Sequence, residues 1–436
     1  MNAGQPATLG PIRLAPGIQR RHSLAYLFAA LISIGIFTFF SALTPYILQV
    51  NLGLEPAQHG RISGDLQTWQ EVALLMTIGV WGALSDRVGR RPVYIASFLV
   101  LALGYGLYGF AGSTAELFAC RMLLGFGIAG SSAMLITVIA DYPEEFSRGK
   151  FTGLAFFLNG IGATLFFFAL TNLPLFFQGQ GANPLWAGRF SFLVASGIAL
   201  LAAVVMLGLK PGRPDAVAER VPLKTLLRQG LAAGRKPRIA LCYVGAFAAR
   251  ADMVIITIFI TLWVAQSGAT AGMSAASAAG KAGLVIGIAL SSALVWSPVF
   301  GWIGDRVDRV TYVIIGFLLA AIGYGWIGSI DDPTAATAIP ALILLGVGQT
   351  SAALASTLLL GQEAPPEIRG SVFGLQSFCG AVGILTISAA GGRLFDAVGP
   401  WAPFAVMGVV NGVVCLWAIA LRSFEPKAVA PASVQG

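Results

Sequence analysis

The sequence predicts an all-α membrane protein with twelve transmembrane helices in two pseudo-symmetric six-helix bundles. First, the 436 residues are 56% hydrophobic and only 11% charged, whereas soluble domains carry about a quarter charged residues. Second, long apolar runs follow one another without strand-like alternation, and only helices or closed barrels satisfy the backbone in lipid. Third, the pattern of residues 82–90 returns at 301–309, a shift of 301 − 82 = 219 residues.

The apolar runs give six spans in each half of the chain. About twenty charge-poor residues cross a hydrocarbon core, which sets the boundaries. The spans are expected at 24–48, 64–85, 92–112, 116–140, 150–172, 186–209, 239–265, 281–303, 310–330, 335–361, 370–392 and 400–421. The chain then divides into a tail at 1–23, a bundle at 24–209, a basic linker at 210–238, a second bundle at 239–421 and a tail at 422–436.

The net charge of +8 indicates membrane orientation, and we expect no nucleic-acid partner. Most Arg and Lys residues lie in the loops that share one side with the termini and the linker. The opposite loops hold few, namely Arg61, Arg189, Lys281 and Arg393. The positive-inside rule therefore predicts a multi-pass protein of the bacterial inner membrane with both termini cytoplasmic. The four cysteines fall inside predicted spans, and no zinc or disulfide pattern indicates a metal, a cofactor or an enzyme.

The repeat extends beyond the first motif. Gly104 returns as Gly323 after 219 residues, and Gly125 returns as Gly346 after 221. Three segments, 104–109, 125–130 and 323–328, match Gly-x-Gly-x-x-Gly, which in a soluble βαβ unit suggests dinucleotide binding. Here each lies inside an apolar run with no preceding strand, so close packing of small residues between helices is the better interpretation.

Two motifs resemble those of the major facilitator superfamily. The loop motif consists of Gly82, Asp86, Arg87, Gly89, Arg90 and Arg91, and the motif of the fourth span consists of Arg121, Gly125, Gly127 and Ala129. The second copy of the loop motif is degraded, with Asp308 at the position of Gly89. The resemblance implies two six-helix bundles around a central cavity that opens alternately to each side of the membrane.

A charged cytoplasmic gate is expected at the loop motif. Asp86 should pair with Arg90 or Arg87 and be joined by Asp141, with the glycine of the motif letting helices approach closely. The cluster is expected to latch the cytoplasmic side in the outward-open state and to break in the inward-open state, unless these are ordinary loop charges. Asp305, Arg306, Arg309 and Glu363 should form a weaker mirror cluster. The gate set is Gly82, Asp86, Arg87, Arg90, Arg91, Asp141, Arg148, Asp305, Arg306, Arg309, Glu363 and Arg369.

Ionisable residues within the spans are candidates for a substrate or proton pathway, because a charge near the bilayer centre costs roughly 2.5–3.5 kcal/mol on insertion scales. Arg250 and Asp252 lie about 200° apart around one helix. We place Arg250 in the cavity and Asp252 against a neighbouring helix, with a local structural network of both as the alternative. Glu71 and Asp252 are the proton-site candidates, and Asp65 is expected to cap its helix. Further pathway candidates are Arg121, Gln349, Asn159 and Gln376.

These features predict a secondary active transporter for a small organic solute. Two arginines within the spans, Arg121 and Arg250, favour an organic anion, and protons are the expected coupling ion because no ATP-binding loop is visible. The alternative is an efflux pump for drugs or hydrophobic compounds. The expected partners are the small-molecule substrate, protons and the lipid bilayer, and the protein is expected to be a monomer.

Overall fold

A computed structural model of the chain describes residues 7–212, the N-half, and 223–424, the C-half. The N-half contains the hairpin strands β1 (Thr8–Leu9) and β2 (Ile12–Arg13). Its helices are α1 (Arg20–Val50), α2 (His59–Val88), α3 (Arg90–Tyr108), α4 (Thr114–Asp141), α5 (Arg148–Thr171), α6 (Leu173–Gly179) and α7 (Pro184–Val205).

The C-half is helical in the part of the chain that the structure describes. Its helices are α8 (Leu223–Ala233), α9 (Pro237–Val254), α10 (Ile260–Thr270), α11 (Ala275–Gly304), α12 (Arg309–Ile327), α13 (Ile339–Glu363), α14 (Arg369–Ala397) and α15 (Ala402–Phe424). A π-helical stretch, Ile255–Phe259, joins α9 to α10. Short 3-10 helices occur at Pro56–Gln58, Glu145–Ser147, Met206–Gly208, Ala336–Ala338 and Pro366–Ile368.

The described residues include eleven helical segments that are long and apolar enough to cross a membrane. Each overlaps one of the predicted spans. The remaining predicted span, 64–85, coincides with α2, which is 30 residues long but is not one of the eleven. Its amino-terminal half carries Gln67, Gln70 and Glu71, and these polar residues line a cavity.

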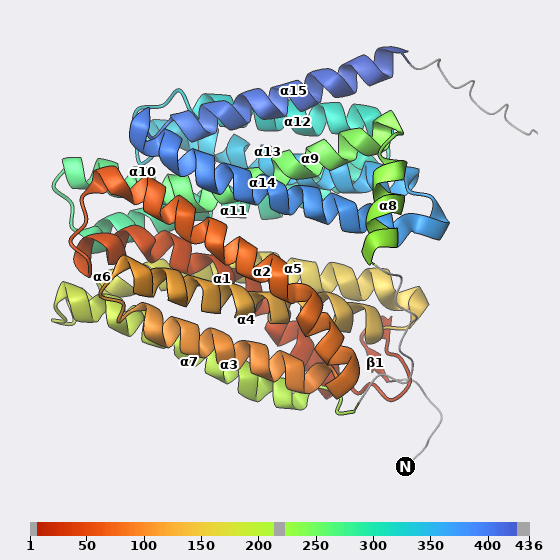
Figure 1. Ribbon diagram of the computed structural model, residues 1–436, viewed down its shortest axis with the longest axis horizontal. Helices are drawn as coiled ribbons and strands as arrows, with labels where there is room; N and C mark the ends of the chain where they lie inside the picture. Colours follow the sequence, from red (N-terminus) through yellow and green to blue (C-terminus); the bar gives the residue numbers. More distant parts are fainter. Residues whose placement is uncertain (1–6, 213–222, 425–436) are drawn as a thin grey trace, which may run out of the picture.

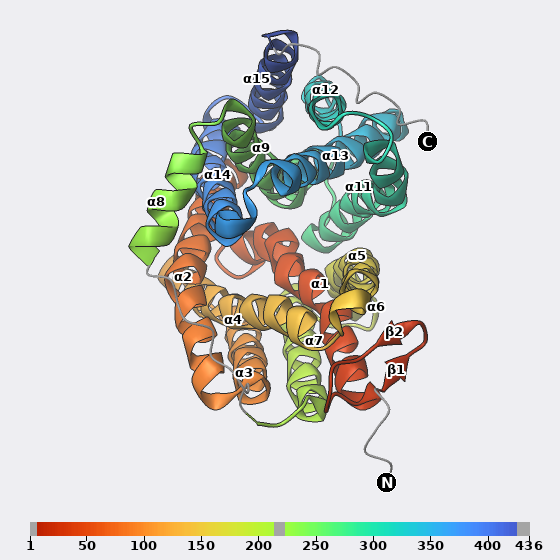
Figure 2. The same cartoon turned by 90° about the vertical axis from the view of Figure 1, so that its right-hand side faces the viewer.

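The two halves lie side by side with their helices roughly parallel to the long axis of the molecule (Figures 1 and 2). We call the end from which α1, α3, α5, α9, α12 and α14 start the linker side, because the chain crosses between the halves there. In Figure 1 it is the right-hand end, where α8 packs along α14. The other end, where α2, α4, α7, α11, α13 and α15 start, is the opposite side.

Equivalent helix contacts recur in both halves. Gly127 of α4 lies against Leu101 of α3, and Gly348 of α13 lies against Ala320 of α12. The two pairs are related by the offsets of the repeat, since 348 − 127 = 221 and 320 − 101 = 219. A Cβ atom at either glycine would come within 2.8 Å of its neighbour. A Cβ atom at Gly104 or at Gly323, in the other two segments, would come within 2.7 Å of α4 or 2.9 Å of α13. The Gly-x-Gly-x-x-Gly segments therefore allow close helix packing, and the dinucleotide alternative receives no support from these contacts.

Three elements were not predicted, namely the hairpin, α6 and α8. The hairpin segment is held by a bridge between Leu14 and Pro143 and by a hydrogen bond from the Arg13 amide to Ser147 Oγ of 3.0 Å. Helix α8 lies in the predicted linker and is tied to α14 by a 2.7 Å hydrogen bond from Ser371 to Gln229. Residues 213–222 of the linker, 1–6 of the first tail and 425–436 of the second lie outside the described residues.

Candidate functional site

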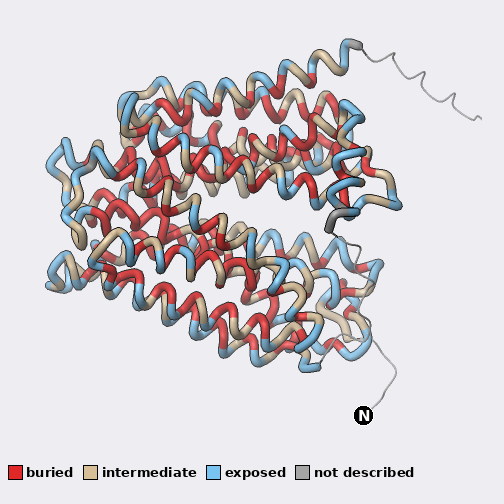
Figure 3. The backbone as a smooth tube through the Cα atoms, in the orientation of Figure 1, coloured by how far each residue is buried: buried red, intermediate tan, exposed pale blue. Residues whose placement is uncertain are grey.

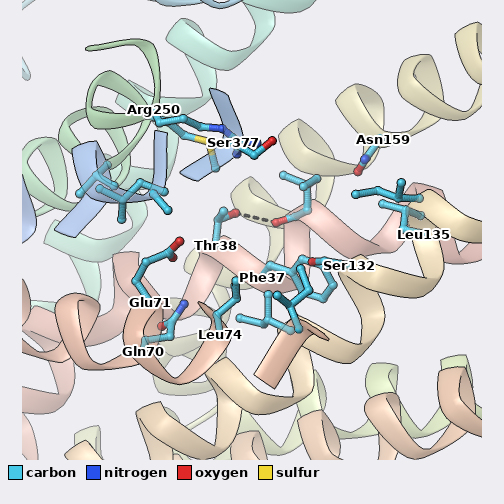
Figure 4. Close-up of a pocket in the computed structure, with 18 of the residues that line it drawn as sticks. Phe37, Thr38, Gln70, Glu71, Leu74, Ser132, Leu135, Asn159, Arg250 and Ser377 are labelled. Atoms are coloured by element: carbon cyan, nitrogen blue, oxygen red, sulfur yellow. Dashed lines mark hydrogen bonds between the residues drawn. The ribbon is translucent and has the colours of Figure 1, made fainter. Parts of the chain in front are cut away.

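A cavity of about 570 Å³ lies between the two halves. Helices α1, α2, α4 and α5 of the N-half and α9 and α14 of the C-half form its wall, as Figure 4 shows for the labelled side chains. Most of the lining is apolar. The polar lining residues are Tyr26, Thr38, Ser41, Gln67, Gln70, Glu71, Ser132, Asn159, Arg250, Thr257 and Ser377.

The opposite side of the cavity is closed by polar contacts between α2 and α14. The Asp396 carboxylate accepts hydrogen bonds from the backbone amides of Gly60 (3.0 Å) and Arg61 (2.7 Å). It therefore caps the amino end of α2, where the helix dipole favours a negative charge. One turn further along α2, Asp65 accepts from Arg393 of α14 at 2.9 Å.

Close glycine contacts complete this closure. A Cβ atom at Gly64 of α2 would collide with the Ser388 carbonyl of α14, and one at Gly283 of α11 would collide with the Thr171 hydroxyl of α5. In contrast, Tyr26 near the start of α1 and Ile139 near the end of α4 line the cavity toward the linker side. The cavity is therefore closed at the opposite side and extends toward the linker side, where Figure 3 shows the halves apart.

Sequence reasoning missed this closure. The expectation that Asp65 caps its helix is wrong, because α2 begins at His59 and Asp65 pairs with Arg393 of the other half. The carboxylate that does cap α2 is Asp396, which comes from another helix. The available signal was the small-residue spacing of Gly60 and Gly64, which is typical of close helix packing.

Arg90, at the start of α3, joins three helix ends on the linker side. Its Nη1 donates to Asp86 Oδ1 (2.6 Å) and to Ser85 Oγ (2.7 Å) of α2, and its Nε donates to Asp141 Oδ2 of α4 (3.0 Å). These pairs are formed in this arrangement, in which the cavity extends toward the linker side. All of these residues belong to the N-half, so the two halves can separate on the linker side without breaking the pairs.

The other gate residues of the N-half do not join this cluster through a described ion pair. Arg148 pairs with Glu145 in an exposed contact of 2.7 Å, Arg87 is exposed and Arg91 is half-buried. A Cβ atom at Gly82 would meet nothing within 4 Å. Gly82 therefore makes no close helix contact in this arrangement, and its expected role in close helix approach stays a prediction.

The mirror cluster of the C-half is organised differently from the prediction. Glu363 pairs with Arg238 at 2.8 Å, Arg309 donates to the Gly304 carbonyl at 2.5 Å, and the Arg306 guanidinium lies 3.6 Å from the centroid of the Trp302 ring. Glu363 forms no described ion pair with Arg306 or Arg309. The repeat offset of 221 places Gln362 at the position equivalent to Asp141, since 362 − 141 = 221, and Gln362, Asp305 and Arg309 line one small surface pocket.

Two further linker-side residues complete the C-half. Arg369 donates to the Gly361 carbonyl at 3.4 Å. Asp308 caps α12 by accepting from the Thr311 amide at 2.9 Å. Partial burial acts to raise the pKa of Asp308, but the Thr311 hydrogen bonds and the Arg422 charge outweigh it and lower the pKa below its usual value. In the second copy of the loop motif, Asp308 thus caps α12 at the position where Gly89 precedes α3 in the first copy.

We expect Arg90→Gln to destabilise the N-half. The variant loses charge-assisted hydrogen bonds to Asp86 and Asp141, which together should contribute roughly 1–2 kcal/mol after allowance for partial exposure. Thermal unfolding of the purified protein, followed by tryptophan fluorescence, should show a lower melting temperature. Arg148→Gln is the control, because its exposed pair should contribute no measurable stability. Equal melting temperatures for both variants and the unmodified chain would contradict the structural role of Arg90.

Arg121 lies fully buried beside the cavity and is held by neutral acceptors. Its guanidinium donates to Gln70 Oε1 (2.9 Å), Thr44 Oγ1 (2.6 Å) and Tyr108 Oη (3.1 Å), and it lies 4.3 Å from the centroid of the Phe40 ring. No carboxylate of the described residues pairs with it. Arg121 is therefore not free to bind a solute directly, but it fixes the amide of Gln70, which lines the cavity.

Arg250 and Asp252 of α9 occupy different environments. Arg250 lines the cavity, and Figure 4 shows it across from Glu71 of α2. Asp252 is fully buried away from the cavity, where both carboxylate oxygens accept from Asn411 of α15 at 3.0 and 3.1 Å. Gln349 of α13 lines a smaller chamber that also contacts Arg250. The structure therefore brings Glu71, Arg250 and Gln349 to connected cavities and leaves Asp252 outside them.

The fold and the cavity define a helical, multi-pass membrane protein with a solute-sized chamber between its two halves. A family model described as Major Facilitator Superfamily matches residues 25–385 and 244–435. The chain therefore belongs to the Major Facilitator Superfamily of membrane transporters.

Several curated relatives cover most of the chain. Magnetosome protein MamH of Paramagnetospirillum magneticum is 27% identical over 416 residues, which are 94% of each protein. Magnetosome protein MamZ of the same organism is 25% identical over 86% of this chain, but the match spans only 59% of MamZ. Multidrug resistance protein MdtH of Aeromonas hydrophila is 24% identical over 79% of this chain and 82% of its own length.

Solved structures share the fold at low sequence identity. The nucleoside transporter NupG superposes with a TM-score of 0.71 at 14% identity, covering 92% of this chain and 99% of NupG. A D-xylose-proton symporter also gives a TM-score of 0.71, at 16% identity, covering 91% of this chain and 96% of the symporter. These similarities establish the fold and leave the solute open.

Proposed function

We propose that this protein is a secondary active transporter that moves a small organic solute by alternating access, coupled to protons. The observation that carries the proposal is the asymmetric closure of the cavity. Glycines join the halves on the opposite side, while glycines on the same helices face open space on the linker side. Alternating access requires these linker-side faces to meet when the opposite side opens.

The register of the helix pairs identifies which faces would meet. Gly64 contacts Ser388, and Thr171 contacts Gly283, each across an antiparallel pair of helices. Eighteen residues, or five turns at 3.6 residues per turn, return to the same helix face. Because the paired helices are antiparallel, a shift of eighteen residues toward the linker side adds to one number and subtracts from the other. The contact of Gly64 with Ser388 then corresponds to Gly82 with Gly370, and that of Thr171 with Gly283 corresponds to Gly153 with Gly301. A Cβ atom at any of the four linker-side glycines now meets nothing within 4 Å.

The same proposal assigns orientation and span number. Most basic residues lie at linker-side helix ends, so the positive-inside rule makes this side cytoplasmic, in a bacterial inner membrane. Helix α2 is counted as the twelfth span because it packs along α4 and α14. The chain then consists of two six-helix bundles, 24–209 and 239–421, joined by a basic linker.

Glu71 is the proposed proton site. Its side chain lines the cavity, is buried, and faces the Arg250 guanidinium without an ion pair among the described residues. A carboxylate in an alternately exposed cavity can take up a proton on one side and release it on the other, and an intramembrane acid of this kind is typical of proton relays. Solute binding near Arg250 would change the electrostatic environment of Glu71. Solute binding and proton binding would therefore influence each other.

We expect Glu71→Gln to uncouple transport from the pH gradient. A screen of solutes against the purified protein by thermal shift supplies the substrate, and proteoliposome flux is then measured with and without a pH gradient. The unmodified protein should accumulate the solute with the gradient, whereas Glu71→Gln should retain only solute exchange. Gradient-driven accumulation that survives in the variant would contradict the role of Glu71, and absence of flux for every solute bound would contradict transport itself.

An efflux pump for drugs or hydrophobic compounds is the alternative function. The mostly apolar lining of the cavity favours it, as does the similarity to a protein named for multidrug resistance. The MamH and MamZ relatives are named as magnetosome proteins, and these names state no solute. Overexpression that raises resistance to hydrophobic dyes would favour efflux, whereas a growth defect of a deletion strain on one carbon source would favour uptake.

A further inference from the structure

A second, smaller chamber of about 210 Å³ opens beside the central cavity within the C-half. It lies between α9, α13 and α14, and small side chains such as Ala246, Ala249 and Ala353 form part of its wall. Arg250, Met253 and Ser377 line both this chamber and the central cavity. The two spaces therefore adjoin at the Arg250 side chain.

The polar groups of this chamber lack partners within the protein. Arg250 makes no hydrogen bond or ion pair with any described residue, although it is a cation near the middle of a span. Gln376 lines the chamber with only 7% of its surface exposed, and its amide has no hydrogen bond among the described residues. Arg250 is exposed to the cavity space, so its guanidinium is open to a solute that enters, and Gln376 lines the same chamber. A cation near the middle of a span normally faces a partner or a cavity that receives one, and these donors consequently indicate a ligand.

Arg250 also differs from the other cation of the region. Arg121 has its donors occupied by Gln70, Thr44 and Tyr108, so the unoccupied guanidinium is that of Arg250. The stem of Arg250 lies against Gly380 of α14, where a Cβ atom would come within 2.6 Å of its Cγ. This glycine therefore provides the space that the arginine occupies at the chamber entrance.

The chamber is suited to a compact oxyanion. Guanidinium, amide and hydroxyl donors come from Arg250, Gln349, Gln376 and Ser377, and no carboxylate lines this chamber. Arginine pairs well with carboxylate and phosphate groups, because its planar fork matches their geometry. The adjoining central cavity offers a larger and mainly apolar wall, including Phe37.

We propose that the solute is an amphiphilic organic anion, with its carboxylate or phosphate head in the chamber beneath Arg250 and its apolar body in the central cavity. The proposal rests on the proposed function, because it names the substrate class of the same cavity. It explains why one cavity combines an apolar wall with an unpaired cation. It also places the charged head within reach of Arg250, the cation that faces Glu71.

Equilibrium binding to the full chain in lipid nanodiscs tests this proposal with four probes. These are 4-phenylbutyrate, its neutral amide 4-phenylbutanamide, phenyl phosphate and acetate. We expect 4-phenylbutyrate to bind at least about tenfold more tightly than the amide, because charge-assisted hydrogen bonds are roughly twice as strong as neutral ones. Acetate, which lacks the apolar body, should bind far more weakly. Tighter binding of phenyl phosphate than of 4-phenylbutyrate would identify the head as a phosphate, and the reverse would identify a carboxylate.

Variants localise the binding. Arg250→Gln should reduce binding of the acid to that of the amide, whereas Arg422→Gln, which removes an exposed cation elsewhere, should leave the preference unchanged. Equal binding of acid and amide by the unmodified chain would overturn the proposal. So would an acid preference that persists in Arg250→Gln.

A second readout applies if Arg250→Gln fails to fold. In a chain without native cysteines, Ser377→Cys should react with a maleimide more slowly when 4-phenylbutyrate is present and at an unchanged rate with the amide. Equal reaction rates with and without 4-phenylbutyrate would contradict its binding in the chamber. Because binding is measured without flux, an acid preference in a protein that transports nothing would refute the proposed function alone.

Discussion

Gly64→Val should hold the protein open on the opposite side. In the present arrangement a Cβ atom at Gly64 would collide with the Ser388 carbonyl, and a backbone carbonyl cannot rotate away as a side chain can. Overpacking of this kind costs about 1–3 kcal/mol, which changes the ratio of closed to open molecules roughly 5–150-fold. The valine should therefore favour the conformation in which α2 and α14 separate on this side.

Distances between spin labels would reveal this shift. Labels at Gln180 and Ser329, both exposed and one in each half, report the opposite side, and labels at Lys150 and Glu367 report the linker side. Gly64→Val should lengthen the first distance and shorten the second. The control is Gly197→Val in α7, where a Cβ atom meets nothing within 4 Å, so both distances should stay as in the unmodified chain. An unchanged first distance in Gly64→Val would show that the halves do not separate there.

Gly82→Val should have the converse effect. The register that joins Gly64 to Ser388 would bring Gly82 against Gly370 when the linker side closes, and two glycines permit backbones to approach closely. A valine at Gly82 costs nothing in packing now, since open space surrounds the position. It should therefore leave the linker-side-open conformation intact, prevent closure and nearly abolish transport.

Two measurements separate this effect from misfolding. The melting temperature of Gly82→Val should remain close to that of the unmodified chain, apart from a small loss of helix propensity. The labels at Lys150 and Glu367 should show a single long distance that no solute shortens. Normal proteoliposome flux in Gly82→Val would refute the predicted contact between Gly82 and Gly370.

The sequence predicted the helices well because each span is a local property of composition. The apolar runs predict the positions of the helices, and α2 is predicted despite Glu71 because the residues that follow it, 72–81, are mostly apolar. The angular separation of Arg250 and Asp252 also assigned their environments, since two residues along a helix point to different faces. In each case the relevant physics lies within one helix.

The contacts between the halves could not be predicted in the same way. Asp396 caps α2 from a helix more than 300 residues later, and Gly60 lies beside Gly392, but no periodicity within either helix specifies its partner. The mirror cluster differs for another reason. The repeat offset of 221 places the uncharged Gln362, and not Glu363, at the position equivalent to Asp141. A sequence also does not specify which side of the cavity is open in a given structure. The prediction that Gly82 allows close helix approach applies to the conformation in which the linker side is closed.

A cross-link between Gly82→Cys and Gly370→Cys tests alternating access most directly. In a chain that lacks Cys120, Cys242, Cys379 and Cys415, an oxidant should join the two new cysteines in part of the population, because a disulfide requires Cα atoms about 4.4–6.8 Å apart. Gly64→Val should increase the cross-linked fraction several-fold. Failure to cross-link in both backgrounds, or a fraction that Gly64→Val leaves unchanged, would contradict the rocking of one half against the other.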